Sequence, residues 1–169
     1  MKYLFILLTL ALSGCSALQI VGTKYDSDGF PIEIVENDSR SCIKYIGYNS
    51  LLKEMEKDAQ NEMWLAEKLE QNKKHIPAGG KIIVTVKAQT IEVANTKYWE
   101  YVVQTIDGQE IQREEGTDDI PDYTVGSFDT TWWNIDTISL IAKLSSPIKI
   151  FVIDKLSQKR SSWIIHPAK

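Results

Sequence analysis

Beyond residue 80, apolar and polar side chains alternate in steps of two, a period that is typical of β-strands. The alternation predicts strands at 81–87, 98–106, 110–113, 132–144, 148–153 and 162–165. Asp107-Gly108, between the second and third of these, predicts a tight hairpin turn. Strands of this length and spacing predict an antiparallel β-sandwich over residues 80–166.

Between residues 49 and 75 the apolar period is that of a helix. The residues that recur at spacings of three and four are Leu52, Met55, Ala59, Met63, Ala66 and Leu69. Asn49 or Ser50 is suited to cap the amino end, and Pro77 with Gly79-Gly80 ends the pattern. We therefore expect one long amphipathic helix, about 38 Å at 1.5 Å per residue, whose apolar stripe packs against the sandwich.

Two short apolar runs, 18–21 and 32–35, precede this helix, and turn-forming residues separate them. They predict short strands or an extended tether over residues 15–48. A single globular domain is expected over 49–169, because no internal repeat or second hydrophobic core divides the chain. The expected fold class is α+β, mainly an antiparallel β-sandwich in the carboxy-terminal half with the helix packed against it.

The first fourteen residues have the composition of a signal peptide. Lys2 is followed by an apolar run over 3–12 and then by Ser13 and Gly14. The run is shorter than the ~20 residues that a membrane-spanning helix needs.

Leu12-Ser13-Gly14-Cys15 resembles the lipobox of bacterial lipoproteins at all four positions. The resemblance implies lipidation of Cys15, cleavage before it and a permanent membrane anchor. Ser16 in the next position, by resemblance to enterobacterial sorting, implies the outer membrane if the source has two membranes. The strand spacing is also loosely similar to that of immunoglobulin-like and C2-like β-sandwiches, but no residue motif of either family is present, so no function follows from it.

Charge argues against a nucleic-acid partner. The formal net charge is −4, and it becomes −5 once the signal with Lys2 is removed. Basic residues are scattered along the chain, so neither a nucleic-acid surface nor a polybasic membrane patch is expected.

No set of catalytic residues emerges from the motifs. A serine or cysteine nucleophile needs a histidine base, and the chain holds His75 and His166 alone. Ser50-Leu51-Leu52-Lys53 has a Ser-x-x-Lys spacing, which is better explained as a helix cap followed by a solvated lysine. No close pair of cysteine or histidine ligands predicts a transition-metal site. A non-enzymatic protein is therefore expected, with a hydrolase that uses loop carboxylates and His166 as the alternative.

The polar stretch from 114 to 129 is predicted to be an acidic loop. Its clustered carboxylates are Glu114, Glu115, Asp118, Asp119 and Asp122. Oxygen ligands of this kind bind calcium when they converge, so a calcium-dependent binding module is a second alternative. The competing interpretation is a loop that only increases solubility, with no cofactor.

Aromatic residues offer a further site. Trp132 and Trp133 are adjacent in a predicted strand and must point to opposite faces. An exposed tryptophan next to Tyr123 would stack on a sugar or anchor a protein, whereas packing of both into the core is the competing interpretation. The expected partners are thus the membrane, through the lipid, and an envelope protein or glycan.

Cys42 is open to two interpretations once Cys15 is assigned to the lipid. It is a small buried hydrophobe, which its strand-like neighbours favour, or a reactive or intermolecular thiol.

Overall fold

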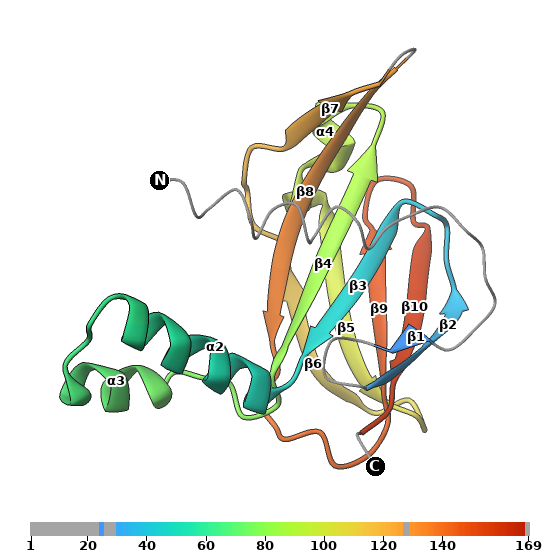
Figure 1. The fold of residues 1–169 in the computed structure, drawn as a ribbon. Coiled ribbons are helices and arrows are strands. Elements are labelled where there is room, and N and C mark those ends of the chain that lie inside the picture. Colours follow the sequence, from blue (N-terminus) through green and yellow to red (C-terminus); the bar gives the residue numbers. More distant parts are fainter. Residues whose placement is uncertain (1–23, 26–29, 127–128, 168–169) are drawn as a thin grey trace.

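Two antiparallel sheets dominate the computed structural model, which describes residues 24–25, 30–126 and 129–167 (Figure 1). The larger sheet has the strand order β1-β2-β10-β9-β5-β6. Its strands are β1 (Lys24–Tyr25), β2 (Pro31–Glu36), β5 (Trp99–Thr105), β6 (Glu110–Glu115), β9 (Ile148–Asp154) and β10 (Arg160–Ile165). The smaller sheet has the order β3-β4-β8-β7. Its strands are β3 (Ser41–Ile46), β4 (Lys81–Ala88), β7 (Asp122–Val125) and β8 (Thr130–Ser139).

The inward faces of both sheets contribute to one hydrophobic core, as the alternating pattern requires. Trp99, Val103 and Ile150 come from the larger sheet, and Ile82 and Val84 from the smaller one, and none is more than 1% exposed. Because these residues belong to one cluster, the sheets pack face to face in a β-sandwich-like arrangement. The mainly antiparallel fold that the alternation predicts is confirmed.

The hairpin predicted at Asp107-Gly108 is present between β5 and β6. Gly108 has a φ of 93° and donates its amide to the carbonyl oxygen of Thr105. Other boundaries differ from expectation. The strand predicted to reach residue 144 ends at Ser139, and two short helices, α4 (Ile91–Ala94) and η2 (Thr96–Tyr98), connect β4 to β5.

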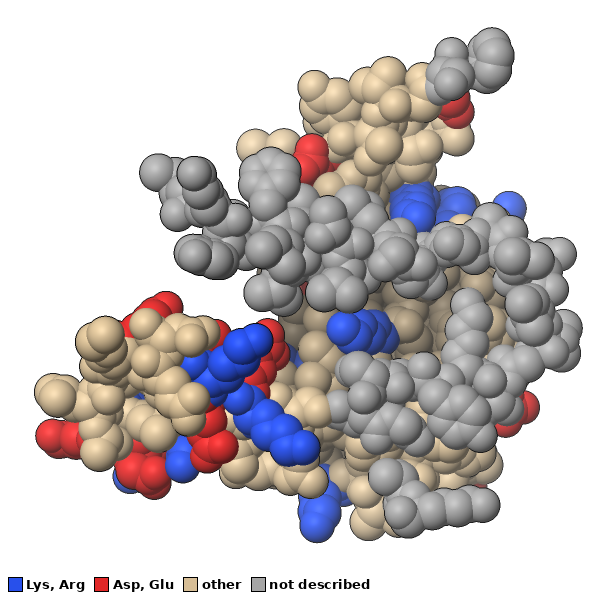
Figure 2. Space-filling view, in the orientation of Figure 1, with Lys and Arg blue, Asp and Glu red and all other residues tan. Residues whose placement is uncertain are grey.

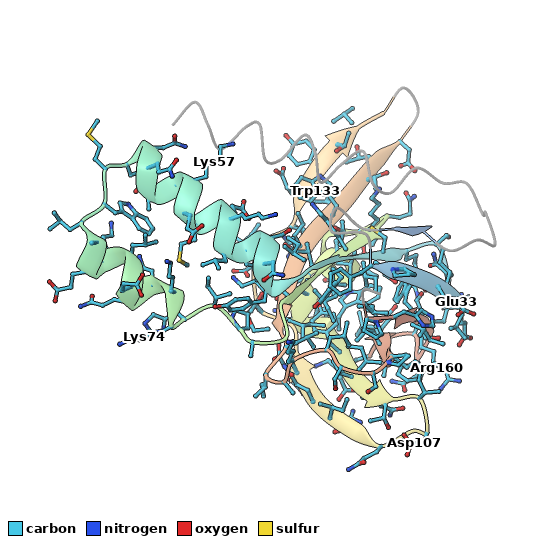
Figure 3. The ribbon with its side chains drawn as sticks, turned by 60° about the horizontal axis from the view of Figure 1, so that its bottom comes forward. Glu33, Lys57, Lys74, Asp107, Trp133 and Arg160 are labelled. Carbon is cyan, nitrogen blue, oxygen red and sulfur yellow. The ribbon has the colours of Figure 1, made fainter. Side chains whose placement is uncertain are left out.

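The prediction of one long helix packed against the sandwich is wrong. The segment forms two helices, α2 (Tyr48–Asn61) and α3 (Ala66–Lys73), which pack mainly against each other as a hairpin that projects from the sheets (Figures 1 and 3). Neither predicted cap is used, because Gly47 takes the capping position of α2.

The break between α2 and α3 lies at Met63. Met63 adopts a left-handed φ of 54°, which an α-helix does not tolerate. Of the predicted stripe, Ala59 is buried and Leu52 and Met55 are half-buried, but Met63 is 89% exposed. The apolar side chains of each helix pack mainly against the other helix of the hairpin and not against the sandwich. Among the described residues, no helix has the length and apolar character needed to cross a bilayer.

Residues 31–46 supply one strand to each sheet, and the crossing between the sheets is held by an ion pair. Arg40, after β2, places its Nη1 atom 2.7 Å from the Oδ2 atom of Asp154 at the end of β9. Asp154 is 1% exposed and also accepts hydrogen bonds from the Ser157 hydroxyl and the Leu156 amide. Burial by itself raises the pKa of Asp154, but the hydrogen bonds from Ser157 and Arg40 outweigh it, so that pKa is lowered.

Candidate binding surface on the β7–β8 ribbon

Strands β7 and β8 form a ribbon that extends beyond the rest of the smaller sheet (Figure 1). The pairing of β8 with β4 runs from Ser139 to Trp132, opposite Ala88 at the end of β4. The pairing of β8 with β7 continues past this point to Thr130, opposite Val125. The end of the ribbon therefore lies beyond the last residue of β4.

Tyr123 and Trp132 face each other across the ribbon. They are direct cross-strand partners, and their ring centroids are 5.3 Å apart with the planes tilted by 49°. Tyr123 is 56% exposed and Trp132 is half-buried, whereas Trp133 on the opposite face is 8% exposed. The prediction that the two tryptophans point to opposite faces is confirmed, and the ring next to Tyr123 is the accessible one.

Aliphatic residues extend this aromatic pair. Ile120, just before the strand, is 87% exposed, and Val125, on the same face as Tyr123 two residues later, is 70% exposed. We call Ile120, Tyr123, Val125 and Trp132 the β7 surface. In Figure 2 the ribbon at the top of the molecule is mostly uncharged. Exposed apolar residues grouped in this way mark interaction sites in soluble domains.

The outer edge of β7 has unused backbone groups. In the described part of the chain, β7 pairs with β8 alone. The Gly126 amide donates to the carbonyl oxygen of Asp129 at 2.7 Å, so Gly126 and Asp129 form a hydrogen-bonded pair of the β7–β8 ladder. Because such pairs alternate, the main-chain groups of Val125 and Tyr123 point outward. The Tyr123 amide donates a hydrogen bond to the Asp122 side chain. Residues 122–125 contain no lysine, arginine or proline, the residues that commonly prevent an edge strand from pairing with another strand.

Each of the five acidic residues predicted as calcium ligands makes its own local contacts. Glu114 accepts from Gln112, Glu115 pairs with Lys155, Asp118 with Lys97 and Asn95, Asp119 accepts from Thr117, and Asp122 from the Tyr123 amide. The structure does not bring the five together, and no group of three or more metal-ligating side chains occurs in its described residues.

Asp118 illustrates how these charges are balanced. Hydrogen bonds from Asn95 and Lys97 lower the pKa of its carboxyl group. The ammonium group of Lys97 lies 3.1 Å from Asp118, so the pair is close to neutral without a bound ion.

The histidine proposed for a hydrolase lies far from the acidic loop. His166 directly follows Ile165, the last residue of β10. Ile165 pairs with Ile148 of β9, and Ile148 pairs with Thr105, so His166 lies near the carboxyl end of β5. The prediction that 114–129 is a loop is wrong in part, because this stretch contains the end of β6 and strand β7. It begins at the other end of β5, where Glu115 is opposite Glu100. The nearest acidic partner of His166 is Glu33, with 3.5 Å between Nε2 and Oε2. The histidine and the loop carboxylates therefore do not form a common site.

A buried hydrogen bond that the sequence pattern did not predict connects β6 of the larger sheet to β8 of the smaller sheet. Gln112 of β6 is 9% exposed and donates from Nε2 to the carbonyl oxygen of Ser139 in β8, at 2.9 Å. Tyr101 lies beside it, 1% exposed. Burial and the charges of Asp136 and Glu114 raise the pKa of Tyr101 above its ordinary value. Its hydroxyl therefore stays protonated at neutral pH.

Two small cavities lie among the described residues. One lies between β6 and the segment after β8, against Ile111, Leu144 and Ile148, and another lies between the helices against Met55 and His75. Each holds about 250 Å³, less than the 300–1,000 Å³ typical of ligand sites, and no carboxylate lines either of them.

Of the two cysteines, only Cys42 lies in the described part of the chain. Cys15 and its lipobox lie outside the described residues. Cys42 lies in β3 opposite Thr85, is half-buried and is not a free thiol. Because Cys15 is the only other cysteine of the sequence, a disulfide between the two and a lipid on Cys15 exclude each other, and both interpretations of Cys42 stay predictions.

No protein-family model, curated protein or solved structure matches this chain.

Proposed function

We propose that this protein is an envelope lipoprotein, anchored through acylated Cys15, whose β-sandwich-like domain binds a partner without catalysis. The lipobox tetrapeptide supports the anchor, and Ser16 favours the outer membrane in a cell that has two. The exposed Tyr123–Trp132 pair beside the open edge of β7 is the observation that carries the binding role.

The partner we propose is an extended segment of another envelope protein. An open strand edge recognises a peptide through main-chain hydrogen bonds, and apolar side chains on alternate positions add affinity. The outward main-chain groups of Val125 and the rings of Tyr123 and Trp132 supply these two elements. A glycan would use the rings but not the strand edge.

The binding role is tested by cross-linking in intact cells. A photoreactive phenylalanine analogue replaces Tyr123 in one strain and Asp107 in the control strain. Asp107 is exposed at the β5–β6 turn and lies far from Trp133 in Figure 3. We expect a discrete protein adduct from position 123 and none from position 107.

A proline variant distinguishes strand addition from stacking alone. Val125→Pro removes an outward amide and leaves the β7–β8 ladder intact, because proline is tolerated where the amide faces solvent. The adduct from position 123 should be lost in this variant. Adducts of equal yield from both positions would contradict the proposal, and an adduct with carbohydrate and no polypeptide would assign the surface to a glycan.

A further inference from the structure

The turn between α2 and α3 presents apolar side chains at the end of a projecting arm. Met63 is 89% exposed and Leu65 is 78% exposed. Met63 has the largest exposed fraction among the exposed large hydrophobic residues of the described chain. We call Met63 and Leu65 the hairpin tip. The α2–α3 hairpin projects from both sheets (Figure 3), and neither residue belongs to the core cluster of the sandwich.

The exposure of the tip is fixed by the residue between its two members. Trp64 donates its amide to the Ala59 carbonyl oxygen at 2.9 Å and its indole Nε1 to Glu62 at 2.6 Å. The ammonium group of Lys68 lies 4.1 Å from the centroid of the Trp64 ring. These contacts hold Trp64 against the helices, while the left-handed backbone of Met63 turns its side chain outward. A non-glycine residue in this conformation is strained and is retained where the surroundings fix it.

We propose that the hairpin tip inserts into the surface of the bilayer that carries the acylated Cys15. The inference rests on the lipid anchor proposed above, and it adds a second membrane contact made by the folded domain itself. The partner is the interfacial region of the bilayer, where apolar side chains enter the acyl boundary and tryptophan and lysine remain at the level of the headgroups. Trp64 and Lys68, directly behind the tip, provide this second layer.

The segment between Cys15 and the folded domain is short, so the proposed anchor keeps the domain close to the bilayer. Eight residues separate Cys15 from Lys24, the first residue of β1. Fully extended, they span at most about 30 Å. In Figure 1 the hairpin projects to the left of the sandwich, β1 lies on its right side, and the β7–β8 ribbon lies at the top. Insertion of the tip would therefore leave the β7 surface at a different side of the domain from the bilayer.

The shape and charge of the hairpin favour a bilayer over a protein partner. The tip is a convex point with two apolar side chains, whereas a stable protein interface buries about 1,200–2,000 Å². Residues 48–76 carry five lysines and six acidic residues, and both signs are mixed on the helices in Figure 2. Such a hairpin is suited to zwitterionic lipids. Two side chains bind weakly by themselves, but the anchor makes their contact intramolecular.

The test uses the full-length acylated protein, purified from its membrane and reconstituted in phosphatidylcholine vesicles. An environment-sensitive fluorescent amino acid replaces Met63, and in a matched control it replaces Lys57, which is exposed on α2 (Figure 3). We expect a blue-shifted emission and quenching by nitroxide-labelled lipids at position 63, and neither at position 57. Leu65→Asp should weaken the quenching at position 63 several-fold, while the protein still floats with the vesicles.

Flotation separates failure of the tip from failure of the anchor. If the protein floats but the probe at position 63 is as accessible to water as the probe at position 57, the tip proposal is overturned and the anchor stands. If the protein does not float, both proposals are overturned. Unchanged quenching in the Leu65→Asp variant would also contradict insertion of the tip.

Discussion

Trp132 and Trp133 are neighbours in β8 and lie on opposite faces of the smaller sheet. Trp133 is 8% exposed and lies opposite Lys87, on the face turned away from the core cluster, whereas Trp132 is half-buried and contacts Tyr123. Two chemically identical side chains, one peptide bond apart, thus differ in burial, and only Trp132 belongs to the proposed binding surface. Their substitutions separate folding from binding.

Replacement of the two tryptophans by alanine should have unequal effects on stability. Trp133→Ala removes a buried ring and is expected to lower the free energy of unfolding by about 3–5 kcal/mol. Trp132→Ala loses the contact with Tyr123 and should lower it by about 0.5–1.5 kcal/mol. Urea unfolding followed by circular dichroism measures both values. Equal losses would show that Trp132 contributes as much to stability as the buried Trp133.

Loss of the buried charge at Asp154 should destabilise the crossing between the sheets. Asp154→Asn weakens the hydrogen bonds from Arg40 and Ser157, and we expect a loss of about 1.5–3 kcal/mol at pH 7. Asp58→Asn, on the exposed face of α2, is the matched control and should change the free energy of unfolding by no more than about 0.5 kcal/mol.

The effect of Asp154 should depend on pH in one direction. Its pKa in the folded protein is lowered, so the unfolded chain takes up the proton first as the pH falls. The stabilisation is complete above the ordinary aspartate pKa of about 3.9 and is lost as the pH falls through the lower folded value. The difference in unfolding free energy between wild type and Asp154→Asn should shrink over this acidic window. A difference that grows on acidification would contradict the assignment.

Calcium should leave the thermal stability of the protein unchanged. The five carboxylates of the acidic loop are held by separate partners, among them Lys97 and Lys155. An ion that binds the folded state raises the melting temperature by mass action. Calorimetry with millimolar calcium, and with magnesium as the control, should give equal melting temperatures. A calcium-specific increase would show that the loop rearranges to form a site.

The sequence was informative where one physical signal dominated. Strict alternation predicted the strands around Trp99 and Ile150, and Gly108 predicted the hairpin. The position of Trp132 next to Trp133 predicted that they would face opposite ways. In each case the outcome depends on local backbone geometry, which the residue types determine.

Two features depended on contacts between distant segments. The break at Met63 has no glycine or proline to announce it, and it arises because α3 folds back on α2. Strand β7 has only four residues, between Pro121 and Gly126 in a polar stretch, which are too few to show an alternating pattern. The strand forms because these residues pair with β8. The acidic loop was predicted as a cluster because its residues are close in sequence, but each contacts a different segment.

Mass spectrometry of the mature amino terminus tests the account most directly. The anchor predicts that the first residue is Cys15 and that it carries a diacylglyceryl group and an amide-linked acyl chain. Cys15→Ala should abolish this mass and leave a soluble exported domain or an uncleaved precursor. The sulfur of Cys15 cannot hold both a lipid and a disulfide, so a mature protein in which Cys15 is cross-linked to Cys42, or one that retains residues 1–14 without lipid, would contradict the account.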